Sequence, residues 1–299
     1  MLNLERILES DRLMRAMTGL NRKAFEQLLP SFKEAYEQHR QQGKVERKRA
    51  AGGGRKATLR TSGEKLFYIL VYCKCYPTFD LMSALFGFDR SCAWDWVHRL
   101  MPVLEKALGH KQALPQRKLR SMAEFLACFP EVKSVILDGT ERPVQRPKDS
   151  ERQKENYSGK KKRHTRKHIT GSTRTKRVIF LTKARGGKVH DKRQLDEEEL
   201  VDYIPDEVAI EGDLGFQGLQ NEFENIYVPH KKPKGKELSE QQKQENREFS
   251  SQRVKCEHAH AGIKRYRSVS DVYRNRVTDF DDCLMLNATG LWNFYLDAA

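Results

Sequence analysis

The sequence has no apolar run long enough to cross a bilayer, and charged residues begin at Glu5, which argues against a secretory signal. It has no internal repeats, which excludes a repeat architecture. These absences predict a cytoplasmic protein built from one large domain or, more typically for 299 residues, two or three smaller ones.

The six cysteines include no CxxC pair. Cys73 and Cys75 are too close together for a usual zinc pairing, and the segment from Cys256 to His260 lacks a second pair of ligands. A structural zinc site is therefore not favoured, and we expect reduced thiols, as in the cytoplasm.

Apolar residues are also scarce, at 38%, whereas basic residues are abundant. Lys and Arg number 56 against 41 Asp and Glu, a formal net charge of +15. Residues 142–193 alone contain 19 Lys or Arg and 4 Asp or Glu, and residues 40–60 form a second basic block. A solvated surface would explain one such run, but two blocks favour nucleic acid as the partner.

Residues 1–42 are predicted to be helical, with Asn21 as an N-cap and Pro30 as a break or kink. Residues 43–60 contain three consecutive glycines among basic residues and are interpreted as a linker or arm. Arg55 and Lys56 of this arm are candidate contacts to DNA phosphates or the minor groove. A plain tether is an equally good interpretation.

Residues 61–112 carry three helical segments, with a stop at Pro77, a cap at Thr78, a turn at Gly87 and a cap at Asp89. A short helix, a glycine-containing turn and a longer helix are typical of a helix-turn-helix, although any three-helix bundle can mimic it. The side chains expected to face inward are Leu81, Ala84, Leu85, Trp94, Val97, Met101 and Leu104. The side chains expected to face a DNA major groove are Arg90, Ser91, Asp95 and Arg99.

From about residue 130 the pattern changes to an α/β one. Short apolar segments are predicted as strands, one ending at Asp138, one at Val178–Leu181 and one leading to Asp213. Alternation also predicts strands at 142–146 and 168–174, and helices are predicted at 191–203 and 237–266.

Two acids are predicted to follow apolar strands directly, Asp138 in Val-Ile-Leu-Asp-Gly and Asp213 in Ala-Ile-Glu-Gly-Asp. Carboxylates at strand ends beside glycines face an open crevice and supply the oxygen ligands that Mg²⁺ prefers. Two such ions can support in-line phosphoryl transfer. For an arbitrary pair of acids, however, a buried salt-bridge role is the commoner explanation.

A third acid, Glu257, lies four residues after Arg253 and seven before Lys264. These spacings place a cation, a carboxylate and a second cation on one helical face. Glu257 would complete a metal site while Arg253 and Lys264 reach flanking phosphates. The alternative is an ordinary surface ion pair, which contributes little.

Several motifs in order resemble those of insertion-sequence transposases of the DDE superfamily, in the branch numbered five and its Harbinger-like eukaryotic relatives. The segments that carry the resemblance are 76–87, 137–141, 157–164, 189–192, 212–218 and 253–264. The family pattern has a Tyr three residues before its Arg, where this sequence has Ser250. That departure concerns one DNA contact and leaves the metal site intact.

The resemblance implies an RNase H-like catalytic core over 130–299, a mixed sheet flanked by helices, preceded by the all-α helix-turn-helix region. It implies Asp138, Asp213 and Glu257 as catalytic residues that hold two Mg²⁺ ions, with Mn²⁺ as a substitute. It further implies cleavage of element ends at terminal inverted repeats and joining of the 3′-hydroxyl to target DNA, by a homodimer on DNA associated with the nucleoid. The implied phosphate contacts beside the site are Tyr157, Lys160, Lys161, Lys162 and His164.

Three other acids are weaker candidates for the metal site. Glu141 lies three residues beyond Asp138, Glu211 should face away from Ile210, and Asp191 is the strongest substitute. Two other functions remain open, a non-catalytic DNA-binding regulator and a nuclease without strand transfer. A basic scaffold without metal is the least favoured.

Overall fold

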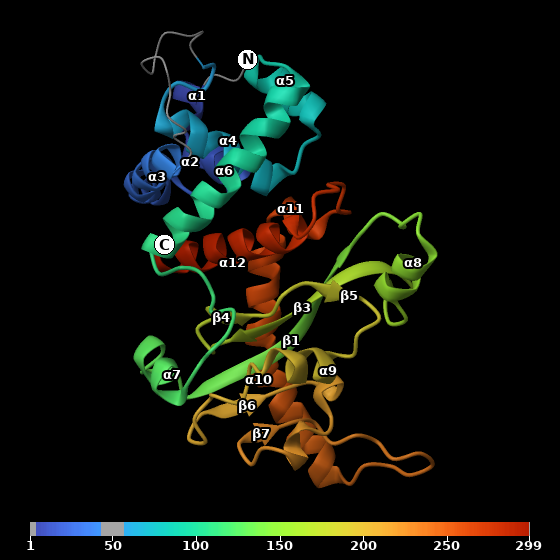
Figure 1. Cartoon of the computed structure of the whole chain (residues 1–299). Coiled ribbons are helices and arrows are strands. Elements are labelled where there is room, and N and C mark those ends of the chain that lie inside the picture. The colour runs from blue at the N-terminus through green and yellow to red at the C-terminus, as the bar shows by residue number, and fades with distance from the viewer. Residues whose placement is uncertain (1–3, 43–56, 299) are drawn as a thin grey trace. The chain divides into compact units, whose positions relative to one another are not determined.

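A computed structural model of the chain describes residues 4–42 and 57–298 (Figure 1). Most of the predicted basic arm, including Arg55 and Lys56, lies outside the described residues. The chain divides into two compact units. The first comprises Met1–Leu114, Ile263–Asp271 and Cys283–Ala299, and the second comprises Pro115–Gly262 and Val272–Asp282.

The first unit is helical. Its helices are α1 (Leu4–Leu8), α2 (Asp11–Thr18), α3 (Arg22–Gln42), α4 (Ser62–Cys75), α5 (Phe79–Phe86), α6 (Arg90–His110), α11 (Arg267–Ser270) and most of α12 (Phe280–Ala298). Local capping rules set several boundaries. The Asn21 side chain accepts from the Ala24 amide at the start of α3, and Thr61 and Glu64 form a capping box at the start of α4.

Pro30 does not break the first long helix, because α3 runs through it. Thr78 caps α5 as predicted, whereas the Asp89 side chain makes no capping hydrogen bond at α6. Within the described residues, no helix is both long and apolar enough to cross a membrane.

The predicted inward face of α5 is wrong. Met82 and Phe86 are buried there, whereas Leu81 is 50% exposed. The buried face is rotated by one residue because the Phe86 ring packs edge-on against Tyr68 of α4, at 4.8 Å between ring centroids. On α6, Val97, Met101 and Leu104 are buried as predicted, but Trp94 is 42% exposed and Ala93 takes the inward position.

The second unit contains the sheet. Its elements are α7 (Met122–Cys128), β1 (Ser134–Pro143), α8 (Ser150–Asn156), β2 (Tyr157–Ser158), β3 (Arg163–Ser172), β4 (Val178–Leu181), β5 (Arg185–Gly186), α9 (Asp191–Glu198), β6 (Ala209–Glu211), the 3-10 turns η1 (Leu214–Phe216) and η2 (Leu219–Asn221), β7 (Ile226–Tyr227) and most of α10 (Glu240–Lys264).

The sheet is mixed and follows the order β2-β3-β1-β6-β7, with β4 and β5 also paired to β3. β3 pairs with β1 in the antiparallel direction. β6 pairs with β1 in the parallel direction, and β7 pairs with β6 in the parallel direction. This mixed sheet with flanking helices confirms the expected α/β, RNase H-like fold class. One boundary prediction is wrong: β1 does not end at Asp138 but continues to Pro143, because β3 pairs with it along that whole length. Residues 142–146 are therefore no separate strand.

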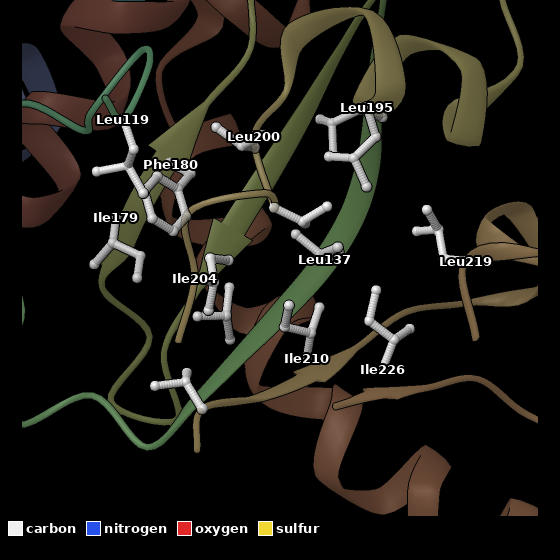
Figure 2. Close-up of a cluster of buried hydrophobic side chains, with 14 of the residues drawn as sticks. Leu119, Leu137, Ile179, Phe180, Leu195, Leu200, Ile204, Ile210, Leu219 and Ile226 are labelled. Carbon is white, nitrogen blue, oxygen red and sulfur yellow. The ribbon is translucent and has the colours of Figure 1, made fainter. Parts of the chain in front are cut away.

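The sheet core lies between one face of the sheet and the elements that cover it. Alternate residues of β1, Val135 and Leu137, pack there with Phe180 of β4, Leu195 of α9 and Ile210 of β6 (Figure 2). Phe125 of α7 belongs to the same cluster. The intervening residues of β1 face the opposite way, toward α10.

The compact units do not follow the expected linear boundary of the catalytic region at 130–299. Residues 283–299 belong to the helical unit, where the Asn293 amide donates to the Ala113 carbonyl and Arg265 stacks on the Tyr295 ring at 3.9 Å. The reason is burial, since Leu284, Leu291 and most other apolar side chains of α12 are buried. Residues 283–299 follow the sheet region in the sequence, yet they belong to the helical unit.

Candidate active site

Two of the predicted acids come from neighbouring parallel strands. The register pairs Ile136 of β1 with Glu211 of β6. Extended by two residues, it brings Asp213 opposite Asp138. Adjacent strands lie about 4.8 Å apart, and paired residues project from the same face. Because β6 ends at Glu211, Asp213 lies in the chain just beyond the strand that neighbours the one carrying Asp138.

Helix α10 covers the face of the sheet to which Asp138 belongs. The Arg253 guanidinium lies 3.5 Å from Oδ1 of Asp138, and Nδ1 of His260 lies 3.4 Å from Oδ2. The Cys256 thiol donates to the same Oδ2 at 4.0 Å. Residues 253, 256 and 260 form one stripe of the helix, at intervals of three and four residues.

His260 is itself held in place from the sheet. Its Nε2 is hydrogen-bonded to Oγ1 of Thr170 at 2.7 Å, and that hydroxyl donates to the Asp138 backbone carbonyl at 3.2 Å. Thr170 is the antiparallel partner of Asp138 on β3. The orientation of the Asp138 side chain is thus determined by two strands and a helix.

The electrostatics of this cluster favour an ionised carboxylate. Burial alone would raise the pKa of Asp138, but the hydrogen bond and charge of His260, the charge of Arg253 and the Gly139 amide outweigh it, so that the pKa lies below its usual value. Burial and the nearby Asp138 charge raise the pKa of Cys256 to about 12. Cys256 is therefore a neutral thiol that donates a hydrogen bond.

Asp213 is fixed by its own turn. Its Oδ1 accepts from the Gly215 amide at 2.8 Å, which caps η1. Gly215 must remain small, because a Cβ there would lie 2.8 Å from this oxygen and 2.7 Å from Oδ2 of Asp191. The glycine pattern noticed in the sequence thus has a steric reason at this position.

Asp191, the strongest substitute among the predicted ligands, approaches from the other face of the sheet. It begins α9, whose Leu195 packs in the sheet core, and its Oδ1 pairs with the buried Lys167 ammonium at 2.7 Å. A Cβ at Gly139 would lie within 3.3 Å of its carboxylate. Asp191 is therefore close to the paired strand ends but already neutralised by a cation.

The remaining acids differ in burial and partners. Glu211 is buried and pairs with Arg174 at 2.6 Å, and Glu141 accepts from the Thr165 hydroxyl. Glu257 is exposed on α10, one residue beyond Cys256, whose pKa it helps to raise. In the part of the chain that the structure describes, no hydrogen bond or ion pair engages its carboxylate.

These residues fit a divalent metal in part. Asp138 lies within β1 and Asp213 follows the neighbouring strand β6, Gly215 leaves room beside Asp213, and Glu257 is available on α10. Among the described residues, three potential ligand atoms come within 4.8 Å of one another at Asp138, Cys256 and His260, not at the three acids. We interpret that group as a hydrogen-bonded support for Asp138, because Mg²⁺ prefers oxygen ligands and a neutral thiol is a poor ligand.

Most of the predicted DNA contacts that the structure describes lie at exposed positions, whereas Arg253 and His164 are half-buried. Arg90, Ser91 and Arg99 are exposed on α6, with Arg90 3.7 Å from Asp80 and Arg99 over the Trp96 ring. The turn from β2 to β3 exposes Lys160, Lys161 and Lys162, and His164 pairs with Tyr157 across these strands. Lys264 is exposed at the last residue of α10 and belongs to the first unit.

The roles of Cys256 and His260 beside Asp138 were not predicted from the sequence. Their helical spacing could have indicated them, because Cys256 and His260 follow Arg253 by three and seven residues on a predicted helix. The ion pair of Lys167 with Asp191 had no comparable signal, since 24 residues separate the partners.

Comparisons with known proteins agree with this geometry. A family model described as DDE superfamily endonuclease matches residues 137–293, and one described as helix-turn-helix of DDE superfamily endonuclease matches 58–110. The chain is also 28% identical over 286 residues, 95% of each chain, to the "Probable transposase for insertion sequence element IS702" of Microchaete diplosiphon. No solved structure matches. The chain, with its helix-turn-helix region followed by an endonuclease region that spans more than half its length, belongs to the DDE endonuclease superfamily.

Proposed function

We propose that the protein is a DNA transposase that binds terminal inverted repeats, cleaves the element ends and joins the 3′-hydroxyl to target DNA. The observation that supports the proposal is the strand order. Asp138 lies on β1, Asp213 follows the neighbouring parallel strand β6, and α10, which carries Glu257, packs against Asp138. The similarity to a chain named as a probable insertion-sequence transposase supports the same conclusion. Membership of the branch numbered five is part of the proposal and rests on the sequence motifs alone.

In this proposal Asp138, Asp213 and Glu257 hold two Mg²⁺ ions, or Mn²⁺ in their place. Bound there, the ions would stabilise the charge that develops on the attacking and leaving oxygens. Arg253 and His260 hold the Asp138 carboxylate ionised and oriented before DNA arrives. With a cation held at Asp138, the Arg253 guanidinium would be able to contact a neighbouring phosphate.

The DNA contacts form two groups. Exposed Arg90, Ser91 and Arg99 of α6 would meet base edges in the major groove, as the second helix of a helix-turn-helix does. Lys160, Lys161, Lys162, His164 and Lys264 would contact phosphates. Two element ends must be held together during transposition, so we expect a homodimer on DNA at the nucleoid.

The domain assignment belongs to the same proposal. It comprises an N-terminal helical segment at 1–42, a basic glycine-rich linker or arm at 43–60, a helix-turn-helix domain at 61–112 and a catalytic region at 130–299.

The test is cleavage and joining of a supercoiled plasmid that carries the element ends, with Mg²⁺ or with EDTA. Asp138→Ala should reduce both reactions more than about 100-fold, because even residues that only support metal ligands account for 10–100-fold. Asp206→Asn, at an exposed acid outside the site, should leave both unchanged.

Other outcomes favour other functions. Specific binding without cleavage by the unaltered protein would indicate a non-catalytic regulator. Cleavage without joining would indicate a nuclease of the same fold. Cleavage that survives in Asp138→Ala would contradict the assigned site.

A further inference from the structure

A cavity of about 700 Å³ lies in the second unit, lined by residues of α8, of the β2–β3 hairpin and of the chain beside them. Helix α8 is labelled in Figure 1. Its volume is in the range of about 300–1,000 Å³ that is common for sites that hold a small organic group. We call it the α8 pocket, and its lining residues are Arg146, Gln153, Lys154, Tyr157, Gly159, His164 and Lys188.

The lining is basic and includes no acid. Lys154 pairs with Glu151 at 2.9 Å, but both side chains are largely exposed, so solvent weakens this pair. Lys188 is exposed, and His164 is half-buried. The pocket therefore attracts an anionic group, as expected within the most basic part of the chain.

One cation of the pocket is held in a fixed position. Nε and Nη2 of Arg146 donate to Oε1 of Gln153 at 3.1 and 2.9 Å. The Gln153 amide in turn donates to the Pro147 carbonyl at 2.8 Å. A guanidinium fixed in this way loses less conformational entropy when it binds a phosphate.

The aromatic member of the pocket is Tyr157, which is 45% exposed. Its ring contacts the His164 imidazole at 72°, with 5.8 Å between centroids. An edge-to-face contact leaves aromatic surface uncovered, and a nucleobase can stack on such a surface. Open space lies beside Gly159, because a Cβ there would meet no atom within 4 Å.

We infer that the α8 pocket binds an unpaired deoxynucleotide of the DNA substrate, with its base on Tyr157 and its phosphate near Arg146 and Lys188. The inference rests on the proposed function for the identity of the polymer as DNA. A base within a duplex is covered on both faces by its neighbours, so only an extrahelical base can make this contact. A site that binds only a phosphate group would need the cations Arg146 and Lys188 but not the Tyr157 ring.

The test uses a short duplex with one bulged 2-aminopurine and the same duplex fully paired, both in EDTA to prevent cleavage. The unaltered protein should bind the bulged duplex about ten-fold more tightly, with quenched 2-aminopurine emission, because base–aromatic stacking is of this size. Tyr157→Ala should remove the preference and Tyr157→Phe should keep it. The matched control is Tyr227→Ala, at a tyrosine that is 56% exposed on β7.

Equal affinity of the unaltered protein for the two duplexes would overturn the inference, and so would a preference that survives in Tyr157→Ala. If Lys188→Ala weakens both duplexes equally while Tyr157→Ala affects neither, the pocket holds phosphate alone and the inference is wrong. If the protein cleaves the element ends but does not prefer the bulged duplex, the inference about the α8 pocket is wrong and the proposed function stands. Failure to bind either duplex would overturn the proposed function as well.

Discussion

Replacement of Gly215 by alanine should impair the proposed metal site without unfolding the protein. The new Cβ would lie 2.7 Å from Oδ2 of Asp191 and 2.8 Å from Oδ1 of Asp213. Contacts below 3.0 Å are essentially not tolerated, and ordinary contacts begin at 3.4 Å. Each carboxylate oxygen must therefore retreat by about 0.6–0.7 Å.

A displacement of this size is large for a metal-dependent reaction. A misplacement of 1 Å can reduce a rate by about 100-fold, and loss of residues that support metal ligands costs about 10–100-fold. We expect Gly215→Ala to reduce plasmid cleavage by about 10–100-fold and to raise the Mg²⁺ concentration needed for half-maximal rate.

The assay is a Mg²⁺ titration of plasmid cleavage, with circular dichroism to verify folding. Gly63→Ala is the matched control, since its Cβ would have only an ordinary 3.8 Å contact with Thr61. A Gly215→Ala protein with the rate and Mg²⁺ dependence of the unaltered protein would refute the placement of Asp213 in the site.

Three other perturbations test the core, the buried charges and the DNA-facing helix. Leu137→Ala should lower the free energy of unfolding by about 2–5 kcal/mol in urea denaturation, because Leu137 is fully buried in the sheet core. Acidification should lower the free energy of unfolding in two stages, as His168 and Asp282 both have pKa values below their ordinary ones of 6.5 and 3.8. Arg99→Ala should weaken binding to the element ends by about 1–3 kcal/mol in fluorescence anisotropy, if Arg99 contacts base edges.

The sign of the pH effect follows from the partners of these two groups. Burial lowers the pKa of His168, so the unfolded chain takes up a proton first and stability falls as the pH drops below 6.5. Burial alone would raise the pKa of Asp282, but hydrogen bonds from His168 and Arg117 outweigh it. Ionised Asp282 therefore contributes to the free energy of unfolding above pH 3.8, and this contribution is lost as the pH falls through the lowered pKa of Asp282.

Each of these tests has its own contrary result. Val277→Ala, at an exposed position, should cost far less stability than Leu137→Ala, and equal costs would contradict the assigned core. A His168→Gln protein should lose the first stage of the acid effect, and an unchanged pH profile would exclude His168 as its source. Lys33→Ala, exposed on α3, should leave DNA affinity unchanged, and a loss equal to that of Arg99→Ala would indicate only nonspecific attraction.

Much of the local structure was predictable from the sequence, because its causes act within short segments. Capping side chains mark where α3, α4 and α5 begin, and Gly87 ends α5 in a left-handed conformation. Apolar segments located β4 and β6, and polar helix formers located α10. The candidate acids were selected from predicted strand ends, one helical stripe and a family resemblance, and their roles are a proposal.

Only the tertiary structure decided which distant segments meet. The length of β1 depended on its pairing with β3, and the inward face of α5 depended on the Tyr68 ring of α4. The placement of Asp191 on the other face of the sheet followed from its ion pair with Lys167. Caps and periodicity are set by neighbours within one or two turns, whereas register, pairing and burial depend on how separate segments pack. That packing is why the sequence alone indicated the candidate acids but not the residues that hold Asp138 in position.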